Sequence, residues 1–317
     1  MDARPQACPP ARPEAHPTPT PTPPLQTPPF RLQGKAGGGR LVYACPHAGR
    51  HYPADLGARL EIATLRRLED ALVDQLLDGA PAQGATLVCG TYGRAYLDLN
   101  RDPLELDPAM FAEPLPADAR LRTARVAAGL GVFPRYVAGG REIYGRRLGL
   151  DEARARLAAV HGPYHRALAE ALEAARRATG AAILIDWHSM PGPAAAPGLL
   201  EGATPAGRRL PDVVLGDRHG AACAPALTDW AEQQFTAAGL RVARNHPYPG
   251  GYTTETYGRP DAGVHALQVE LSRSLYLDEG RLVPGPGFAR VKRLLAGLTR
   301  DLAAAATTLV PVAAPAG

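Results

Sequence analysis

Apolar positions along the chain follow two spacings that alternate with each other. Short β-rich runs ended by Pro, Gly or polar residues predict strands, and apolar residues at every third or fourth position predict helices. The expected strands are 40–47, 85–92, 181–188, 240–246 and 264–271. The expected helices are 63–80, 152–178, 223–238 and 286–304, and Pro163 should break or kink the second of these.

Strands that alternate with helices indicate a three-layer α/β/α domain with a mostly parallel or mixed central sheet. The chain has 317 residues, which is enough to bury the core of such a domain. Ligands of open α/β sheets bind beyond the carboxyl ends of the strands. We therefore look for chemistry where the predicted strands end.

Both ends of the chain depart from this pattern. Residues 1–38 are rich in Pro and Thr and include the repeat PTPTPTPP, so they predict a disordered tail that buries little apolar surface. Residues 306–317 predict a flexible tail, which leaves 39–305 as a single catalytic domain. The sequence has no apolar signal segment and no apolar run of about 18 residues, so we expect no membrane association and a cytoplasmic protein.

Charge and cysteine usage narrow the class of protein. Three of the four net positive charges fall within residues 1–40, so the predicted domain is nearly neutral. It lacks the basic stripe with interleaved aromatics that is typical of nucleic-acid enzymes, and we expect no nucleic-acid partner. The four cysteines form no CxxC pair, which argues against a disulfide framework or a cysteine zinc cluster.

Polar side chains stand at the ends of three predicted strands. His47 follows the first strand, Asp186 and His188 end the central strand, and Glu270 closes the last one. His, Asp and Glu that converge from separate strands are the composition of a metal-dependent hydrolase site. Because Asp186 lies two residues before His188, both side chains share one face of the strand, and Asp186 is expected to orient a group of the site. Trp187 points to the other face and is expected in the core.

Two positions allow alternatives. The third metal ligand is Asp70 or Asp74, since Arg50 occupies the place of the acid in a His-x-x-Glu arrangement. Glu270 is either a general base or a member of a structural ion pair with Arg273 or another arginine.

Two further motifs carry polar and aromatic side chains. The stretch HGPYH places His161 and His165 four residues apart, but its Gly and Pro interrupt a regular helix, so a packing role is favoured over metal binding. The stretch YPGGYTTETYGRP (248–260) predicts a loop that covers substrate, with Gly250 and Gly251 allowing close approach.

Eight phrases, spread in order over roughly residues 41–300, resemble the N-formylglutamate amidohydrolase family. They are PHAGRHYP, GRAYLDLNRDPLELDP, GVFPRYV, HGPYHRAL, ILIDWHSMP, PDVVLGDRHG, YPGGYTTETYG and ALQVELSRSLY. The resemblance implies a zinc-dependent hydrolase with one zinc ion per chain and a fold related to zinc carboxypeptidases and aspartoacylase-like deacylases. It implies cleavage of a small N-acyl amino acid, with N-formyl-L-glutamate giving formate and glutamate as the expected reaction.

The resemblance also implies roles for individual residues. His47, Asp70 and His188 are the expected metal ligands, and Glu270 and Arg101 are the expected catalytic residues. The residues expected to bind substrate are Arg94, Arg101, Arg141, Asn245, Gly251 and Tyr252. Two alternatives stay open, namely a deacylase or carboxypeptidase-like enzyme for another N-acyl amino acid or peptide, and a non-catalytic relative that binds a metal or ligand. The sequence does not predict the oligomeric state.

Overall fold

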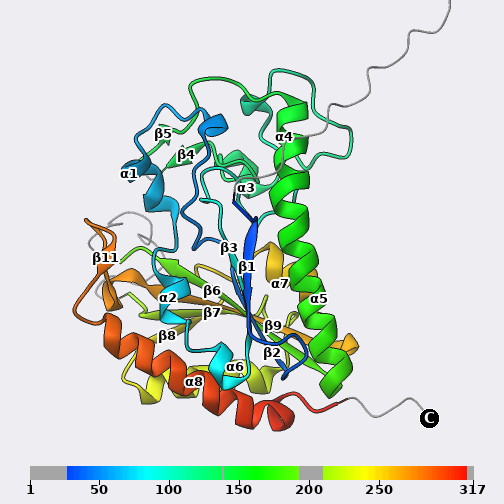
Figure 1. Ribbon diagram of the computed structural model, residues 1–317, viewed down its shortest axis with the longest axis vertical. Coiled ribbons are helices and arrows are strands. Elements are labelled where there is room, and N and C mark those ends of the chain that lie inside the picture. Colours follow the sequence, from blue (N-terminus) through cyan, green and yellow to red (C-terminus); the bar gives the residue numbers. More distant parts are fainter. Residues whose placement is uncertain (1–26, 138, 193–209, 313–317) are drawn as a thin grey trace, which may run out of the picture.

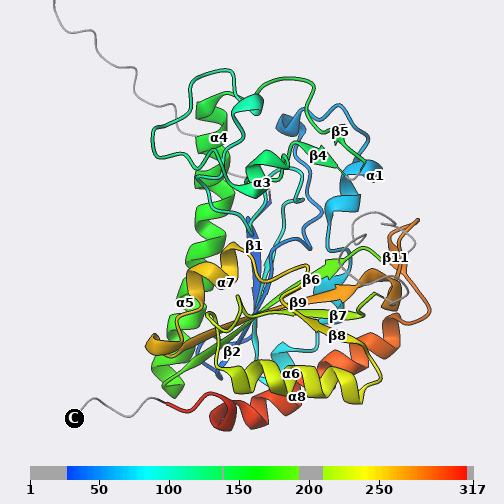
Figure 2. The same cartoon turned by 180° about the vertical axis from the view of Figure 1, so that it is seen from behind.

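A seven-stranded mixed sheet lies at the centre of the protein, with helices on both faces (Figures 1 and 2). The structure, a computed structural model, describes residues 27–137, 139–192 and 210–312. The PTPTPTPP repeat and the last five residues of the predicted C-terminal tail lie outside these ranges. Within them, no helix combines the length and the apolar character that crossing a bilayer requires.

The strand order across the sheet is β1-β3-β2-β6-β9-β7-β8. The four central strands, β3, β2, β6 and β9, run parallel, whereas β1 is antiparallel to β3 and β7 is antiparallel to β9. The large sheet comprises β1 (Phe30–Gln33), β2 (Leu41–Cys45), β3 (Thr86–Gly90), β6 (Ala182–Met190), β7 (Val213–Gly216), β8 (Val242–Arg244) and β9 (Val264–Ser272). Two small hairpins lie outside it, β4 (Tyr136–Val137) with β5 (Arg141–Glu142), and β10 (Leu277–Asp278) with β11 (Val283–Pro284). The expected three-layer α/β architecture with a mixed sheet is confirmed.

Two helical layers enclose the sheet. One face is covered by α2 (Val73–Leu76), α6 (Pro225–Ala237) and α8 (Phe288–Leu309). The other face is covered by α5 (Gly162–Thr179) and by the long connection that follows β3. The remaining helices are α1 (Ile62–Leu65), α3 (Ala124–Ala127), α4 (Leu150–Arg156) and α7 (Tyr252–Tyr257).

Side-chain alternation on β6 and β9 explains where a site can form. On one face of β6, Ile183, Ile185 and Trp187 are apolar throughout and enter the core beneath α6 and α8. The other face begins apolar with Leu184 and then becomes polar, with Asp186 and His188 towards the carboxyl end. β9 follows the same rule, and its Gln268 and Glu270 pair in register with Asp186 and His188. Trp187 therefore packs in the core as predicted, against the edge of the Tyr43 ring.

The predicted helix 63–80 is wrong as a continuous element. It is divided into α1, a 3-10 turn at Arg66–Leu68, and α2, with an extended residue at Glu69 and a left-handed backbone at Leu72 (φ 66°) between them. The Asp70 amide donates to the carbonyl oxygen of His47 rather than to a helical carbonyl. Tertiary hydrogen bonding has thus overridden the helical spacing, and it turns Asp70 towards the sheet.

Pro163 neither breaks nor ends its helix. A π-helical turn at Leu157–His161 joins α4 to α5, and Pro163 lies in the first turn of α5. Proline has no N–H to donate to an earlier carbonyl, and the wider turn accommodates this missing hydrogen bond.

The sheet has strands that the apolar pattern did not predict. β1 lies within the stretch 1–38 that was expected to be disordered, and three of its four residues are exposed. β7 lies within the PDVVLGDRHG motif and was not predicted as a strand, because it is only four residues long. At the other end of the chain, α8 continues to Leu309, beyond the predicted domain end at 305.

Candidate active site

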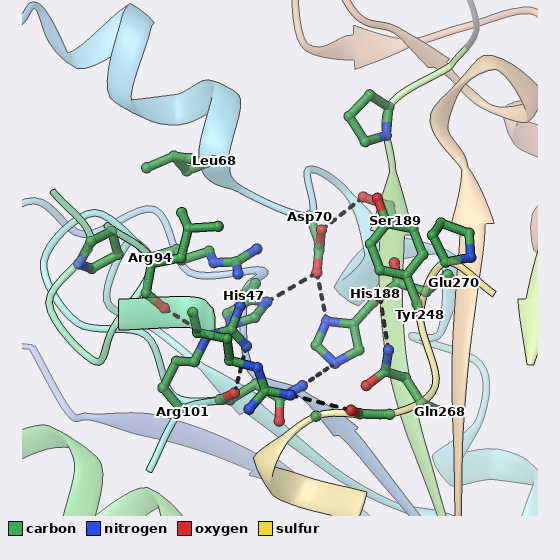
Figure 3. Close-up of a pocket in the computed structure, with 18 of the residues that line it drawn as sticks. His47, Leu68, Asp70, Arg94, Arg101, His188, Ser189, Tyr248, Gln268 and Glu270 are labelled. Atoms are coloured by element: carbon green, nitrogen blue, oxygen red, sulfur yellow. Dashed lines mark hydrogen bonds and ion pairs between the residues drawn. The ribbon is translucent and has the colours of Figure 1, made fainter. Parts of the chain in front are cut away.

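A cleft of about 480 Å³ opens at the carboxyl ends of the central strands. Figure 3 shows that His47, Asp70 and His188 meet at its centre, with Arg94 and Arg101 to one side and Gln268 and Glu270 to the other. These residues come from segments up to 223 positions apart in the sequence, from His47 to Glu270. The cleft is thus formed by the fold and not by any one motif.

His47, Asp70 and His188 form a compact buried cluster in which one atom of each lies within 4.8 Å of the others. Asp70 Oδ2 is 2.9 Å from His188 Nδ1 and 3.4 Å from His47 Nδ1. His47 Nδ1 is buried and has no hydrogen-bond partner among the described residues. Two imidazole nitrogens and one carboxylate oxygen are the donor types that zinc binds in catalytic sites. The cluster therefore fits a metal ion, and the unpartnered nitrogen is the atom that such an ion would satisfy.

The far nitrogen of each histidine is held by its own carboxylate. His47 Nε2 is 2.6 Å from Asp98 Oδ1, and His188 Nε2 is 3.0 Å from Asp186 Oδ2. When Nε2 donates its proton to the carboxylate beside it, Nδ1 keeps the lone pair that a metal requires. Asn100 Nδ2 also lies 3.0 Å from His188 Nε2. Asp186, which was expected to orient a group of the site, thus contacts His188. Asp98 was not among the predicted site residues, although it lies in the motif GRAYLDLNRDP.

Asp70 is fixed in place through its second oxygen. Ser189 Oγ donates to Asp70 Oδ1 at 2.9 Å, and Arg273 Nε donates to Ser189 Oγ at 3.0 Å. Arg273 also donates to the carbonyl oxygens of Glu69, at 2.6 Å, and Arg67, at 3.1 Å. Arg273 therefore supports the segment that carries Asp70 and is not the ion-pair partner of Glu270 that the sequence left open. The other candidate ligand, Asp74, pairs with Arg31 and Arg50 away from the cluster.

Glu270 projects into the cleft from β9, in register with His188 on the neighbouring strand. Its Oε1 accepts a hydrogen bond of 3.0 Å from Gln268 Nε2, which leaves Oε2 for other partners. Burial raises the pKa of Glu270 to about 7, an effect that Asp70 reinforces and His188 opposes. A carboxylate with a raised pKa beside a metal-type cluster is suited to accepting and returning a proton.

Arginines give the cleft a strongly cationic lining, which comprises Arg67, Arg94, Arg101, Arg125 and Arg273. Arg94 Nε donates to Asp98 Oδ2 at 2.8 Å, and Arg101 donates through Nε and Nη1 to two backbone carbonyls, each at 2.9 Å. Among the described residues, the Nη groups of Arg94 and the Nη2 group of Arg101 have no hydrogen-bond partner. These groups remain available for an anionic ligand.

The charges of the site stabilise one another. Burial alone would raise the pKa of Asp98, but Arg94 and His47 hold it well below its usual range. Burial would likewise raise the pKa of Asp70, yet its close contacts with the His188 and His47 imidazoles hold that pKa well below its usual range. Burial lowers the pKa of Arg101 to about 10, against the attraction of Asp98. The carboxylates of the cluster therefore stay ionised at neutral pH.

Three residues predicted to bind substrate do not line the cleft. Arg141 is exposed in the β4–β5 hairpin, and Tyr252 packs against the rings of His161 and His165. Asn245 donates from Nδ2 to Asp217 at 2.7 Å, and its Oδ1 accepts from the Asp217 amide, so its side chain holds a loop. Gly251, by contrast, does line the cleft.

Two other residues of the site, Asn100 and Arg125, are not predicted by the sequence pattern, because no strand end or spacing identifies them. Asn100 Nδ2 donates to Asp186 Oδ2 at 3.2 Å, and its Oδ1 accepts from the Thr253 amide at 2.8 Å. Arg125 lines the cleft beside Gly250, whose carbonyl oxygen it approaches to 3.4 Å. The polar run DLNR was the available signal for Asn100, whereas α3 offered none for Arg125.

Fold and site together define a three-layer α/β protein with a candidate metal site of the hydrolytic type. The family profile described as N-formylglutamate amidohydrolase matches residues 39–277, which is most of the chain. The chain belongs to the N-formylglutamate amidohydrolase family.

Individual relatives agree with this assignment. The chain is 34% identical to an N-formylglutamate deformylase of Pseudomonas aeruginosa over 252 residues, which are 78% of this chain and 86% of the relative. It is 30% identical to an N-formylglutamate deformylase of Pseudomonas putida over 243 residues, which are 75% of this chain and 82% of the relative. The crystal structure of N-formylglutamate amidohydrolase from Ralstonia eutropha JMP134 matches with a TM-score of 0.82 and 36% identity, over 88% of this chain and 98% of that one.

Proposed function

We propose that this protein hydrolyses the amide bond of N-formyl-L-glutamate, releasing formate and glutamate, in a reaction that requires zinc. The observation that carries the proposal is the convergence of the buried cluster, Glu270 and unpartnered arginine nitrogens in one cleft. Membership of the N-formylglutamate amidohydrolase family and the names of the two Pseudomonas relatives support the same substrate.

His47, Asp70 and His188 would hold the zinc ion through His47 Nδ1, Asp70 Oδ2 and His188 Nδ1. Three protein ligands leave a coordination position open, as catalytic zinc sites require. When bound there, the ion supplies Lewis-acid polarisation of the formyl carbonyl group and acidification of a water molecule. Asp98 and Asp186 keep the histidine protons on Nε2 and so preserve the ligand geometry.

Glu270 supplies the proton transfers in this proposal. Its Oε2 takes a proton from the attacking water, whose oxygen bonds to the formyl carbon. When the carbon–nitrogen bond breaks, Glu270 returns that proton to the departing nitrogen, so the leaving group is the neutral amine of glutamate. Gln268 holds the other oxygen of Glu270 and thereby keeps the carboxylate directed into the cleft.

The arginines recognise the substrate's charge. N-formylglutamate carries two carboxylates, and the free Nη groups of Arg94 and Arg101 can bind carboxylate oxygens by charge-assisted hydrogen bonds. Arg125 replaces the predicted Arg141 as the third candidate, because Arg125 lines the cleft and Arg141 does not. An arginine near the scissile bond would also stabilise the oxyanion as it forms.

Replacing Glu270 tests the proposal. With zinc supplied, the wild-type protein should release formate from N-formylglutamate, and Glu270→Gln should lower kcat by about 10²–10⁴-fold while zinc content stays at one per chain. Formate release and elemental analysis measure the two quantities. His188→Ala is the complementary variant, because it should lose both the metal and the activity.

Two results would contradict the proposal. Full activity of Glu270→Gln would remove this residue from the mechanism. An absence of formate release by the zinc-loaded wild-type protein would reject N-formylglutamate as the substrate, and a parallel assay with N-acetylglutamate and short peptides would then separate a related deacylase from a peptidase.

A further inference from the structure

Two histidines, the buried His161 and the half-buried His165, lie outside the cleft and have no part in the chemistry proposed above. His161 ends the π-helical turn, and His165 lies one turn further on in α5. Their rings are 4.3 Å apart between centroids, as expected for residues four positions apart on one helix face. Both point to the connection after β3, which carries Asn100 and Arg101 into the site.

Each histidine holds a backbone carbonyl on one side of Asn100. His165 Nε2 is 2.8 Å from the Leu99 carbonyl oxygen, and His161 Nε2 is 3.0 Å from the Arg101 carbonyl oxygen. A carbonyl only accepts hydrogen bonds, so Nε2 of each ring carries the proton and donates it. Two hydrogen-bond donors that are one helical turn apart therefore hold both ends of the segment 99–101.

The helix α7 also contacts His165 and Asn100. It lies beside α5 in both Figure 1 and Figure 2. The Tyr257 hydroxyl lies 3.0 Å from His165 Nδ1 and 2.9 Å from the His165 carbonyl oxygen, so its single proton can be donated to either acceptor. The Tyr252 ring meets the His165 ring edge-on at 5.1 Å. The amide of Thr253 in the same helix donates to Asn100 Oδ1.

The segment 99–101 carries two side chains of the site, those of Asn100 and Arg101. Asn100 Nδ2 donates to Asp186 Oδ2, the atom that also holds His188 Nε2. Arg101 lines the cleft with its unpartnered Nη2 group. Asn100 and Arg101 belong to the backbone segment that the two histidines hold. A shift of the carbonyl groups of residues 99 and 101 would therefore move the side chains of both residues.

We propose that His161 and His165 are positioning residues, which fix Asn100 and Arg101 in the cleft by donating to the carbonyls on either side. The proposal rests on the proposed function, since Arg101 matters only as a group that binds substrate. Burial lowers the pKa of His165 to about 3 and lowers that of His161 as well, so both rings are neutral donors at neutral pH.

A double-mutant cycle tests this role. His165→Phe keeps a ring but removes the donor, and it should lower kcat/KM for N-formylglutamate about tenfold, mainly through a higher KM, because small misplacements of binding groups are costly. His165→Gln places an amide N–H near the former Nε2 and should recover most of the loss. In an Arg101→Ala background, His165→Phe should lower kcat/KM by a smaller factor than in the wild-type protein, because the part of its effect that passes through Arg101 is already lost.

His265→Phe is the matched control. It removes a buried imidazole that accepts a hydrogen bond of 3.0 Å from the Ala224 amide, at the amino end of β9 and away from the cleft. The control should lower the melting temperature without changing KM. If His165→Phe does not fold, the same cycle is run with His161→Phe, which removes the bond to the Arg101 carbonyl.

The possible outcomes separate this proposal from the proposed function. An unchanged kcat/KM, or an equal loss with and without Arg101, overturns the positioning role. If the zinc-loaded wild-type protein releases no formate, the proposed function fails instead. Hydrogen–deuterium exchange of peptides covering 98–101 then still tests whether the histidines hold this segment. His165→Phe should speed exchange there, because it removes one of the two hydrogen bonds to the segment. Unchanged exchange overturns the proposal.

Discussion

At the scale of single residues, each of the two histidines in the candidate metal site uses its two ring nitrogens for different roles. In both His47 and His188 the Nε2 atom is anchored to a carboxylate while Nδ1 faces Asp70. These contacts fix the orientation of both rings. The anchors Asp98 and Asp186 are buried, and Arg94 and His47 compensate the charge of Asp98.

Loss of one anchor should weaken metal binding more than it weakens the fold. Asp98→Asn keeps an acceptor for His47 but removes the negative charge, and we expect zinc affinity to fall about 10–100-fold. Competition with a chromophoric chelator measures this change. Asp102→Asn is the matched control, because Asp102 pairs with the exposed Arg120 at 2.7 Å. An unchanged zinc affinity in Asp98→Asn would contradict the anchoring role.

The site residues that the sequence predicted and those that it did not predict differ in what determines their position. His188 and Glu270 follow from apolar runs that end in polar residues, so the strand pattern alone predicts that they share an edge of the sheet. Asp98, Asn100 and Arg125 lie in long connections without periodicity. Their neighbours are set by contacts with residues tens of positions away, which no local pattern encodes.

At the scale of elements, the departures from the predicted pattern lie where tertiary hydrogen bonds compete with helical ones. The predicted helix 63–80 is interrupted at Glu69–Leu72, and this interruption delivers Asp70 to the cluster. The helix 152–178 keeps its length but contains a π-helical turn, which brings His161 to the Arg101 carbonyl. The helical spacing of apolar residues correctly predicted the apolar face of each segment, but it could not predict the irregular turns.

The end of β7 shows how one carboxylate stabilises a turn between elements. Asp217 accepts hydrogen bonds from the Gly220 amide at 2.9 Å, Asn245 Nδ2 at 2.7 Å and Thr228 Oγ1 at 3.0 Å. Burial would raise the pKa of Asp217, but the bonds from Asn245 and Gly220 hold it below its usual value. The ionised form is therefore favoured in the folded state.

Asp217→Asn should lower the free energy of unfolding by about 2 kcal/mol at pH 7, since three bonds to a charged acceptor are disturbed. Because folding depresses this pKa, the contribution is complete above the unfolded value of about 3.9 and is lost as pH falls through the folded value. Urea unfolding at pH 7 and below pH 4 should show the difference between the two proteins shrinking in acid. Asp229→Asn, which disturbs an exposed pair with Arg244, should cost less than about 1 kcal/mol at either pH.

At the scale of the whole molecule, the parallel core of the sheet is closed on one side by a strand from outside the predicted domain. β1 pairs along its full length with β3, and Arg31 on it reaches Asp74 in α2 at 2.7 Å. The Tyr92 hydroxyl also donates to the Thr27 carbonyl oxygen. β1 occupies the hydrogen-bonding edge of β3, which would otherwise be free to pair with another chain.

Deletion of residues 1–34 should therefore lower stability and promote self-association. A loss of about 2 kcal/mol is expected, because the net contribution of the lost backbone hydrogen bonds is partly offset by the regained chain entropy. Denaturant unfolding and light scattering measure the two effects, with a deletion of residues 1–26 as the matched control. Equal stability and equal solubility of the two deletions would show that β1 does not protect the edge.

The arginine lining of the cleft also has a consequence for the order of events in a catalytic cycle. Five guanidinium groups around one opening create a positive potential that guides anions inwards, so capture of a doubly charged substrate is fast and slows as ionic strength rises. Hydrolysis of N-formylglutamate divides that double charge between two products, formate and glutamate, each with a net charge of −1. Each product is attracted less strongly than the substrate was, so the same field that speeds capture favours release once the bond is cleaved.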